Sequence, residues 1–263
     1  MSVRAPAVAG RFYPGDPVTL LSTVDDLLAG AGVTGSVDGV ARAYVVPHAG
    51  LRYSGAVAAR VYARLRGQPV RTVVLVGPAH FVPLRGCAVP TTDAWATPLG
   101  DVPIAVDAAR ALVAGRHAGA DDAPHASEHS LEVQLPLLHR VLPEAAVLPV
   151  AVGQVPAPDV AALLDAALAA GGPGTVLVCS TDLSHYLTQD EALATDRVTI
   201  DAICERAPGR VGLRAACGVF ALRGLLAWAT GADAQPALLE HRTSYDTTGD
   251  ASRVVGYAAF ALP

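Results

Sequence analysis

The sequence predicts an α/β fold in which a mainly parallel central sheet is flanked by helices. Short β-branched runs that end at Gly, Pro or a polar cluster are typical of buried parallel strands. Segments with apolar residues at helical spacing separate these runs, and strands that alternate with helices indicate the α/β class. The chain has 263 residues and is 52% hydrophobic, enough for a large core, so we expect one domain over 1–263.

Each expected element follows from a local pattern. Continuous apolar runs predict the strands, and apolar residues at i, i+4 and i+8, such as Val57, Val61 and Leu65, predict the helices. The turn formers Pro98 and Gly100 indicate a loop. We expect, in order, an extended segment at 6–14, a helix at 17–29, a strand at 43–46, a helix at 54–65, a strand at 73–76, a loop at 92–99, a helix at 107–114, a polar segment at 121–130, a helix from about 130, a strand at 146–152, a helix at 159–170, a strand at 175–179, helices at 191–206 and 218–228, and a strand at 253–262. The strand–helix–strand unit that ends at residue 76 predicts a parallel pair joined by a right-handed crossover.

Composition excludes several classes of function. All 19 basic residues are arginine, and without lysine the chain cannot use Schiff-base catalysis, pyridoxal-phosphate attachment or a P-loop. The formal net charge is −5 and no basic cluster stands out, so nucleic acid is not expected as a partner. No apolar run has membrane-spanning length, and residues 1–10 lack the pattern of a secretory signal, so we expect a cytoplasmic protein with no membrane partner.

Metal-capable residues follow three of the expected strands. His48 follows the first, His80 the second, and Asp182 and His185 the third. Because the carboxyl ends of parallel strands border the ligand crevice of an α/β sheet, we expect these side chains to converge on one edge. A lone histidine at a strand end is more often a structural residue than a ligand, but the repeated placement favours a metal site.

Asp182 and His185 each allow more than one interpretation. If the chain turns into a helix after the third strand, the two residues share one face of it. Asp182 could then bind a metal, orient a ligand histidine, or cap the helix. His185 could be a ligand or a general acid or base, and capping does not explain it.

His129 lies at the expected start of a helix, whose N-terminus disfavours a charged imidazole. A neutral His129 could coordinate a metal or donate a hydrogen bond to developing negative charge, or it could be a surface residue of the first turn. Its neighbours Glu128 and Glu132 are expected to be solvated or capping residues.

The four cysteines show no C-x-x-C spacing, and we expect no disulfide. Cys179 and Cys204 lie in apolar periodic segments and are interpreted as core thiols. Cys217 precedes a helix, whose N-terminus would lower the pKa of its thiol and make it a metal ligand or nucleophile. From position alone, a small buried hydrophobic residue is the simpler interpretation.

Seven motifs, in family order across nearly the whole chain, together resemble the Memo family, the middle member of the AmmeMemoRadiSam set (AmmeMemoRadiSam system protein B). They are PAVAGRFYP at 6–14, PHAGLRYSG at 47–55, GPAH at 77–80, EHSLEVQLP at 128–136, STDLSHY at 180–186, the Cys-Gly pair at 217–218, and YDTTGDASRVVGY at 245–257.

The resemblance implies a fold like that of class III extradiol dioxygenases, in which two histidines and a carboxylate bind iron. By motif, His48 and His80 look like the histidine ligands and Cys217 like the third ligand, in place of the carboxylate. His185 looks like the acid/base histidine, with Asp182 beside it and His129 as a further catalytic-site histidine. A thiolate makes the site softer, so copper or zinc competes better with iron.

These observations leave open three functions. The first is a redox protein of dioxygenase descent that uses iron (Fe²⁺) or copper. The second is a non-catalytic, metal-stabilised module that binds a peptide, a small molecule, or a radical-SAM or other AmmeMemoRadiSam partner protein; Trp95, Tyr53 and Arg52, expected beside the site, favour recognition. The third and weaker option is a zinc hydrolase.

Overall fold

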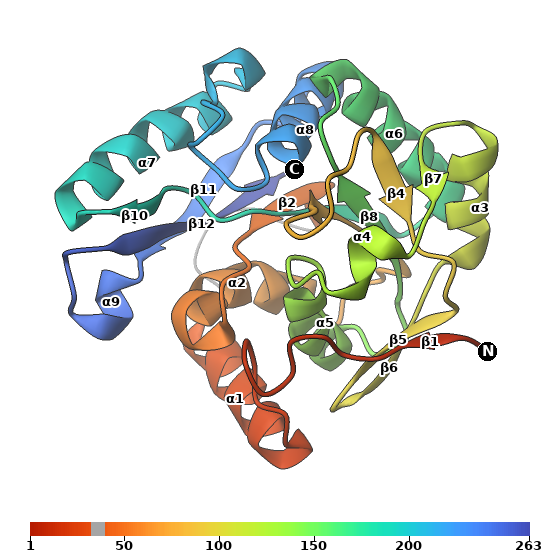
Figure 1. Cartoon of the computed structure of the whole chain (residues 1–263), viewed down its shortest axis with the longest axis horizontal. Helices are drawn as coiled ribbons and strands as arrows, with labels where there is room; N and C mark the ends of the chain where they lie inside the picture. Colours follow the sequence, from red (N-terminus) through yellow and green to blue (C-terminus); the bar gives the residue numbers. More distant parts are fainter. Residues whose placement is uncertain (33–39) are drawn as a thin grey trace.

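Four parallel strands form the middle of the main sheet in the computed structural model, which describes residues 1–32 and 40–263. Their order is β2 (Ala43–Val46), β9 (Thr175–Ser180), β3 (Thr72–Pro78) and β8 (Ala146–Val152). Antiparallel pairs extend the sheet on both sides, through β12 (Val254–Leu262) beside β2 and through β4 (Cys87–Val89) beside β8. The predicted α/β class with a parallel sheet centre is confirmed (Figure 1).

The remaining strands lie at the borders of this sheet or in a small separate sheet. The main sheet also contains β7 (Gly119–Ala120), β10 (His185–Leu187) and β11 (Ala237–Thr243), and the small sheet consists of β1 (Val3–Arg4), β5 (Ala94–Thr97) and β6 (Gly100–Pro103).

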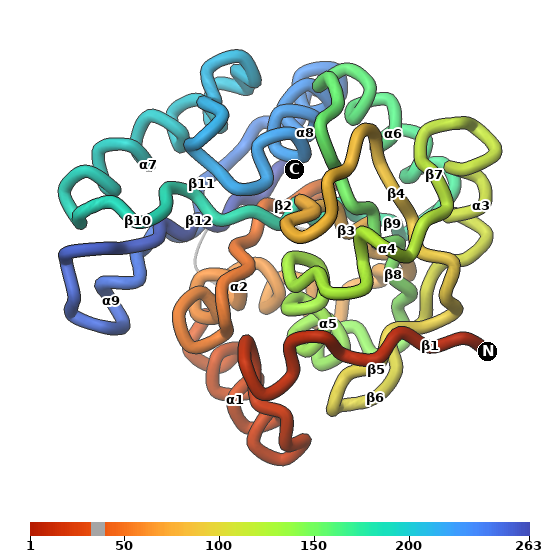
Figure 2. Tube along the Cα trace, in the orientation of Figure 1, coloured from red at the N-terminus to blue at the C-terminus, as the bar shows by residue number. Residues whose placement is uncertain are grey.

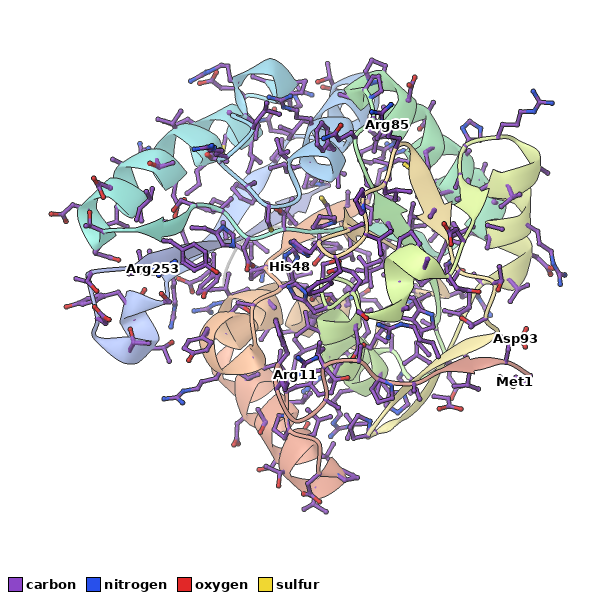
Figure 3. The ribbon with its side chains drawn as sticks, in the orientation of Figure 1. Met1, Arg11, His48, Arg85, Asp93 and Arg253 are labelled. Atoms are coloured by element: carbon purple, nitrogen blue, oxygen red, sulfur yellow. The ribbon has the colours of Figure 1, made fainter. Side chains whose placement is uncertain are left out.

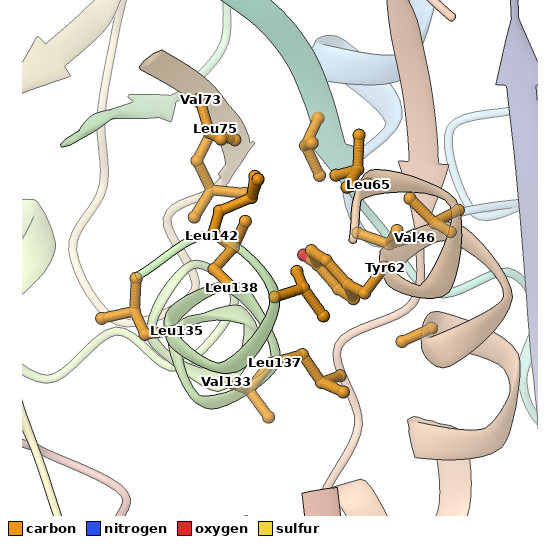
Figure 4. Close-up of a cluster of buried hydrophobic side chains, with 14 of the residues drawn as sticks. Val46, Tyr62, Leu65, Val73, Leu75, Val133, Leu135, Leu137, Leu138 and Leu142 are labelled. Carbon is orange, nitrogen blue, oxygen red and sulfur yellow. The ribbon is translucent and has the colours of Figure 1, made fainter. Parts of the chain in front are cut away.

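The sheet separates two apolar cores. Side chains alternate along β3, so Val73 and Leu75 belong to one core while Val74 and Val76 belong to the other. The first core, part of which Figure 4 shows around Tyr62, is covered by α1 (Pro17–Gly30), α2 (Leu51–Leu65) and α5 (Leu135–Val141). The second is covered by α3 (Val106–Ala114), α6 (Ala157–Gly171), α7 (Gln189–Cys204) and α8 (Val219–Gly231). The short helices are α4 (Ala123–Ala126), η1 (Glu132–Gln134), η2 (Pro208–Arg210) and α9 (Tyr245–Thr248).

The order of the central strands differs from the expected crossover pair. β2 and β3 run parallel, but β9 lies between them and pairs with both. The three strands whose carboxyl ends carry the metal-capable residues are therefore direct neighbours. This arrangement brings the ends of β2, β9 and β3 to one place at the sheet edge.

Three local expectations were wrong. Residues 92–99 are not a loop throughout, because β5 lies within them and buries Trp95. The helix expected from about residue 130 starts as the 3-10 turn η1 and becomes α-helical at Leu135. Pro136 explains this start, because proline fits the first turn of a helix but would break hydrogen bonding further inside. The chain after β9 is extended rather than helical, so Asp182 caps no helix there.

All four cysteines are free. Cys179 is buried in the second core as expected, whereas Cys204 is half-buried and packs against that core. None of the helices in the described part of the chain combines the length and apolarity needed to cross a bilayer.

We predict that Gly224→Ala destabilises the protein, because a Cβ at Gly224 would lie 2.2 Å from Cγ1 and 2.3 Å from Cβ of the buried Val160 where α8 packs on α6. Overpacking of this kind costs about 1–3 kcal/mol. Gly231→Ala on the same helix is the matched control, because a Cβ there meets no atom within 4 Å. Urea unfolding of both variants tests this, and equal stabilities would contradict the close packing of the two helices.

Candidate metal centre

Three histidines converge where the central strands end. One ring nitrogen from each of His48, His80 and His129 lies within 4.8 Å of the other two. Their ring centroids are 5.3 Å apart for His48 and His80, 5.4 Å for His48 and His129, and 4.6 Å for His80 and His129. Figure 3 places His48 near the centre of the molecule. The expectation that His48 and His80 share one sheet edge agrees with this geometry.

A hydroxyl at the end of β9 orients His48. The Ser180 hydroxyl donates to the Ser130 carbonyl at 2.6 Å, so it can only accept from the His48 Nδ1, which lies 2.9 Å away. Gln134 Nε2 fills the remaining acceptor position of that hydroxyl at 3.0 Å. His48 therefore carries its proton on Nδ1, and its Nε2 holds the lone pair that could coordinate a cation.

Glu128 orients His80 in the same way, although it was expected to be a solvated or capping residue. Its carboxylate is 1% exposed and accepts hydrogen bonds from His80 Nδ1 at 2.8 Å and from the backbone N–H groups of His80, His129 and Ser130. Burial alone would raise its pKa, but the hydrogen bonds and charge of His80 and the Ser130 N–H lower the pKa of Glu128 to about 2. A carboxylate can only accept, so Nδ1 of His80 carries a proton, and Nε2 is the lone-pair nitrogen whenever the ring is neutral.

Glu132 is the second acidic residue that was expected to be solvated or capping, and it is neither. It is fully buried, forms an ion pair with Arg4 at 2.6 Å, and accepts from Ala7 N, Val8 N and the Tyr13 hydroxyl. These bonds hold the N-terminal segment, whose path from β1 to α1 is drawn in Figure 2. The same segment carries Phe12, whose ring centroid lies 4.5 Å from that of His129.

Burial keeps His48 and His129 neutral. It lowers the pKa of His48 well below 6.5, helped by the neighbouring His80 and His129, and it lowers the pKa of His129 to about 4. The expected neutrality of His129 therefore arises from desolvation and not from a helix N-terminus. His129 Nδ1 is 3.3 Å from Glu128 Oε1 but forms no hydrogen bond within the described residues. A buried nitrogen without a hydrogen-bond partner fits a site that holds a cation.

Cys217 lies beside His48 but outside the group of three histidines. Its sulfur is 3.0 Å from His48 Nε2, and the backbone N–H of Asp182 donates to it at 3.2 Å. Burial, followed by the Asp182 charge, raises the pKa of the thiol above 9.0, which outweighs the predicted lowering of this pKa by the N–H groups at the start of α8. A bound cation would reverse this effect, since it favours the thiolate.

Asp182 and His185 border the same centre from the segment after β9. Asp182 Oδ1 accepts from His48 N at 2.6 Å and from Ala49 N at 3.3 Å. Burial raises the pKa of Asp182 to about 6, although the N–H of His48 opposes the shift. The Nδ1 of His185 donates to the Leu183 carbonyl at 2.8 Å, which leaves its Nε2 as the basic nitrogen.

A cavity of about 430 Å³ opens next to these groups. His129, Asp182 and His185 belong to its lining, together with aromatic side chains that include Phe12 and Tyr53. Its volume suits a small molecule.

Two residues expected beside the site lie elsewhere. Trp95 is buried in the first core, where Arg4 lies 4.4 Å from its ring centroid. The guanidinium carbon of Arg52 lies 5.7 Å from the ring centroid of Tyr53, and Arg52 is not among the residues that line the cavity.

Comparison with known proteins gives a consistent result over the whole chain. Residues 4–261 match the family described as Memo-like protein. A MEMO1 family protein of Methanothermobacter thermautotrophicus is 35% identical over 97% of this chain and 99% of its own length. Those of Ignicoccus hospitalis and Aquifex aeolicus are 36% and 35% identical, over 100% and 98% of this chain and 99% and 98% of their own lengths. An uncharacterized Escherichia coli K12 protein of known structure covers 84% of this chain and 99% of its own, with a TM-score of 0.53 and 14% identity, which supports the fold alone.

We predict that the metal-free protein loses stability as the pH falls from 6.5 towards 4. The unfolded chain takes up a proton on His129 near 6.5, whereas the folded chain takes it up only near its pKa of about 4, so acid favours unfolding in this window. Asp182, whose pKa is raised to about 6, acts in the opposite direction. The difference between wild type and His129→Gln isolates the histidine, because Asp182 is present in both.

Urea midpoints of EDTA-treated protein at pH 7 and pH 5 measure this effect. His129→Gln should lose less stability than wild type between the two values. Equal losses would show that His129 is not held neutral by the fold.

Proposed function

The chain belongs to the Memo-like protein family, and from this premise we propose that it is a metal-dependent redox protein of dioxygenase descent that uses iron or copper. The observation that carries the proposal is the convergence of His48, His80 and His129 with nitrogen atoms within 4.8 Å of one another. Two of these rings are held through Nδ1, so each keeps Nε2 as the nitrogen that could coordinate a cation. Hydrogen bonds that orient ligand imidazoles in this way are typical of metal sites.

We assign His48 and His80 as the two histidine ligands. Cys217 is the third ligand that the family resemblance implies, and its contact of 3.0 Å with His48 Nε2 supports a shared ion. His129 offers a nitrogen in the same group and is the alternative third ligand. A site of two imidazoles and a thiolate suits copper or zinc as well as ferrous iron.

The residues around the centre suit proton transfer. A bound metal would supply redox chemistry and polarise a ligand oxygen. His185 can accept a proton at Nε2, because its Nδ1 proton is committed to the Leu183 carbonyl. Asp182 fixes the backbone of His48, and neutral His129 can donate a hydrogen bond to developing negative charge.

A metal-stabilised binding module is the second candidate, favoured by the aromatic lining of the cavity. In that case the chain would hold its metal without turnover and recognise a peptide or a radical-SAM partner protein in the cytoplasm. A zinc hydrolase, which would lower the pKa of a bound water, is the weaker alternative.

Metal analysis of protein purified without oxygen, followed by an oxygen-uptake assay, separates these functions. A redox protein should contain iron or copper and consume oxygen in the presence of a reductant. Bound metal without oxygen uptake would favour the binding module, and zinc with hydrolysis of an ester probe would favour the hydrolase. Protein with no metal after anaerobic purification and reconstitution would contradict the proposal.

We predict that Cys217→Ser weakens metal binding, because a hydroxyl is a poor anion at neutral pH. Cys204→Ser is the matched control, since that thiol is also half-buried but packs against the second core. Metal content and melting temperature should be measured for both variants. Unchanged metal content in Cys217→Ser would assign the third ligand position to His129, which His129→Gln then tests.

We also predict that Glu128→Gln lowers metal affinity by about 10- to 100-fold, the usual cost of losing a partner that orients a ligand histidine. Glu144→Gln, a change at an exposed glutamate, should leave the affinity unchanged. Competition with a chelator of known affinity measures both. An equal affinity in the two variants would show that Glu128 does not orient His80 towards a metal.

A further inference from the structure

We propose that the cavity beside the histidines binds a small organic anion whose carboxylate or phosphate group pairs with Arg253 at the cavity mouth. This inference deepens the proposed function, because it names the ligand class of the same site. It does not require a bound metal. The contacts that carry it involve Arg253, Tyr186 and Tyr257, which all line the cavity.

The positive charge of Arg253 at the cavity mouth has no carboxylate partner among the described residues. Its guanidinium carbon lies 4.3 Å from the centroid of the Tyr186 ring, and it forms no ion pair with a carboxylate within the described part of the chain. Asp250 lines the same mouth, but its Oδ1 accepts instead from the Ser252 N–H at 2.9 Å and the Ser252 hydroxyl at 2.6 Å. A guanidinium held over an aromatic ring keeps its edge free for two parallel hydrogen bonds to an oxyanion. Figure 3 shows Arg253 beside the α9 segment, on the side of the molecule where the last strand begins.

The partner ring of Arg253 is held by an unusual backbone conformation. Tyr186 has a φ of 61°, in the left-handed region that a bulky residue seldom adopts. The cause is a register shift between His185 and Leu187 where β10 pairs with β12. Strained residues of this kind concentrate at ligand sites. The irregular pairing places the basic His185 and the Arg253-bound Tyr186 next to each other on one cavity wall.

The inner part of the cavity offers a hydrogen-bond donor and aromatic surface. Tyr257 is 2% exposed, and its hydroxyl has no hydrogen-bond partner among the residues that the structure describes. A buried hydroxyl that borders a cavity is suited to bind a ligand group or water. The rings of Phe12 and Tyr53 supply apolar walls for an organic body. The Asp182 carboxylate on the same lining is already bonded to the N–H groups of His48 and Ala49, so its charge is partly compensated.

Calorimetric titration with simple probes tests the inference. Benzoate and phenyl phosphate are the anionic probes, benzamide is the neutral isostere of benzoate, and inorganic phosphate lacks the aromatic body. Metal-loaded and EDTA-treated protein should both be titrated at one fixed ionic strength, because an anion could also bind directly to a metal. At least one aromatic anion should bind more tightly than benzamide and inorganic phosphate, and the stronger of benzoate and phenyl phosphate identifies the oxyanion.

Arginine variants give the decisive comparison. Arg253→Gln should weaken binding of the anionic probe by about tenfold or more, as expected for loss of a charge-assisted hydrogen bond, and should not affect binding of benzamide. Arg52→Gln is the matched control, because Arg52 also lies over a tyrosine ring but does not line the cavity. Tyr186→Phe should keep the affinity, since it keeps the ring, whereas Tyr186→Ala should lower it. Melting temperatures confirm that each variant is folded.

The outcomes separate this inference from the proposed function. Absence of anion binding to wild type, or equal weakening by Arg253→Gln and Arg52→Gln, would overturn the anion site even if the protein binds metal. Arg253-dependent anion binding to a protein that holds no metal would support the anion site and overturn the redox function. Neither variant changes a proposed metal ligand, so metal content should stay at the wild-type value.

Discussion

The candidate centre depends on the hydroxyl of Ser180, which connects three of its segments by hydrogen bonds. It lies at the end of β9, the strand between the two that lead to His48 and His80, and it takes part in three hydrogen bonds. One of them fixes the proton of His48, and the other two join β9 to Ser130 and Gln134. The order of the central strands matters for the site, because β9 lies between β2 and β3 and brings the Ser180 hydroxyl to His48. Replacing it would leave buried polar groups without partners, which costs more than the loss of an ordinary hydrogen bond.

Two buried carboxylates complete the framework, and their burial would be unfavourable without several donors each. Glu128 accepts from His80 after β3 and from its own neighbours His129 and Ser130, whereas Glu132 accepts from the N-terminal segment. The two residues are four positions apart in the sequence but bind different partners. One orients a ring at the centre, and the other holds the segment that carries Phe12 against it. Buried carboxylates therefore fix the positions of the His80 ring and of the segment with Phe12 through hydrogen bonds, which are more directional than apolar contacts.

Much of this architecture could be predicted from the sequence, for identifiable reasons. The runs before His48 and His80 are apolar on both faces, which defines buried parallel strands and hence the edge where their ends meet. Glu128 and Glu132 were missed because an acid near a helix start has the same local pattern whether it is solvated or buried. The donors of Glu132 lie more than 100 residues away in sequence, so only the folded chain reveals them. The position of Glu128 directly before the candidate site residue His129 was the one available signal. The left-handed Tyr186 could not be predicted, because it depends on a pairing irregularity and not on a glycine.

The contribution of β12 to the cavity has a consequence for biosynthesis. Tyr257 lies on β12, and Arg253 directly precedes that strand. β12 follows every other element of the site in chain order, yet it is inserted beside β2, which forms near the beginning. A ribosome-bound chain that has not yet released β12 has its histidines but lacks one wall of the cavity around them. The complete cavity around the histidines therefore exists only after this last strand has been synthesised and has paired with β2.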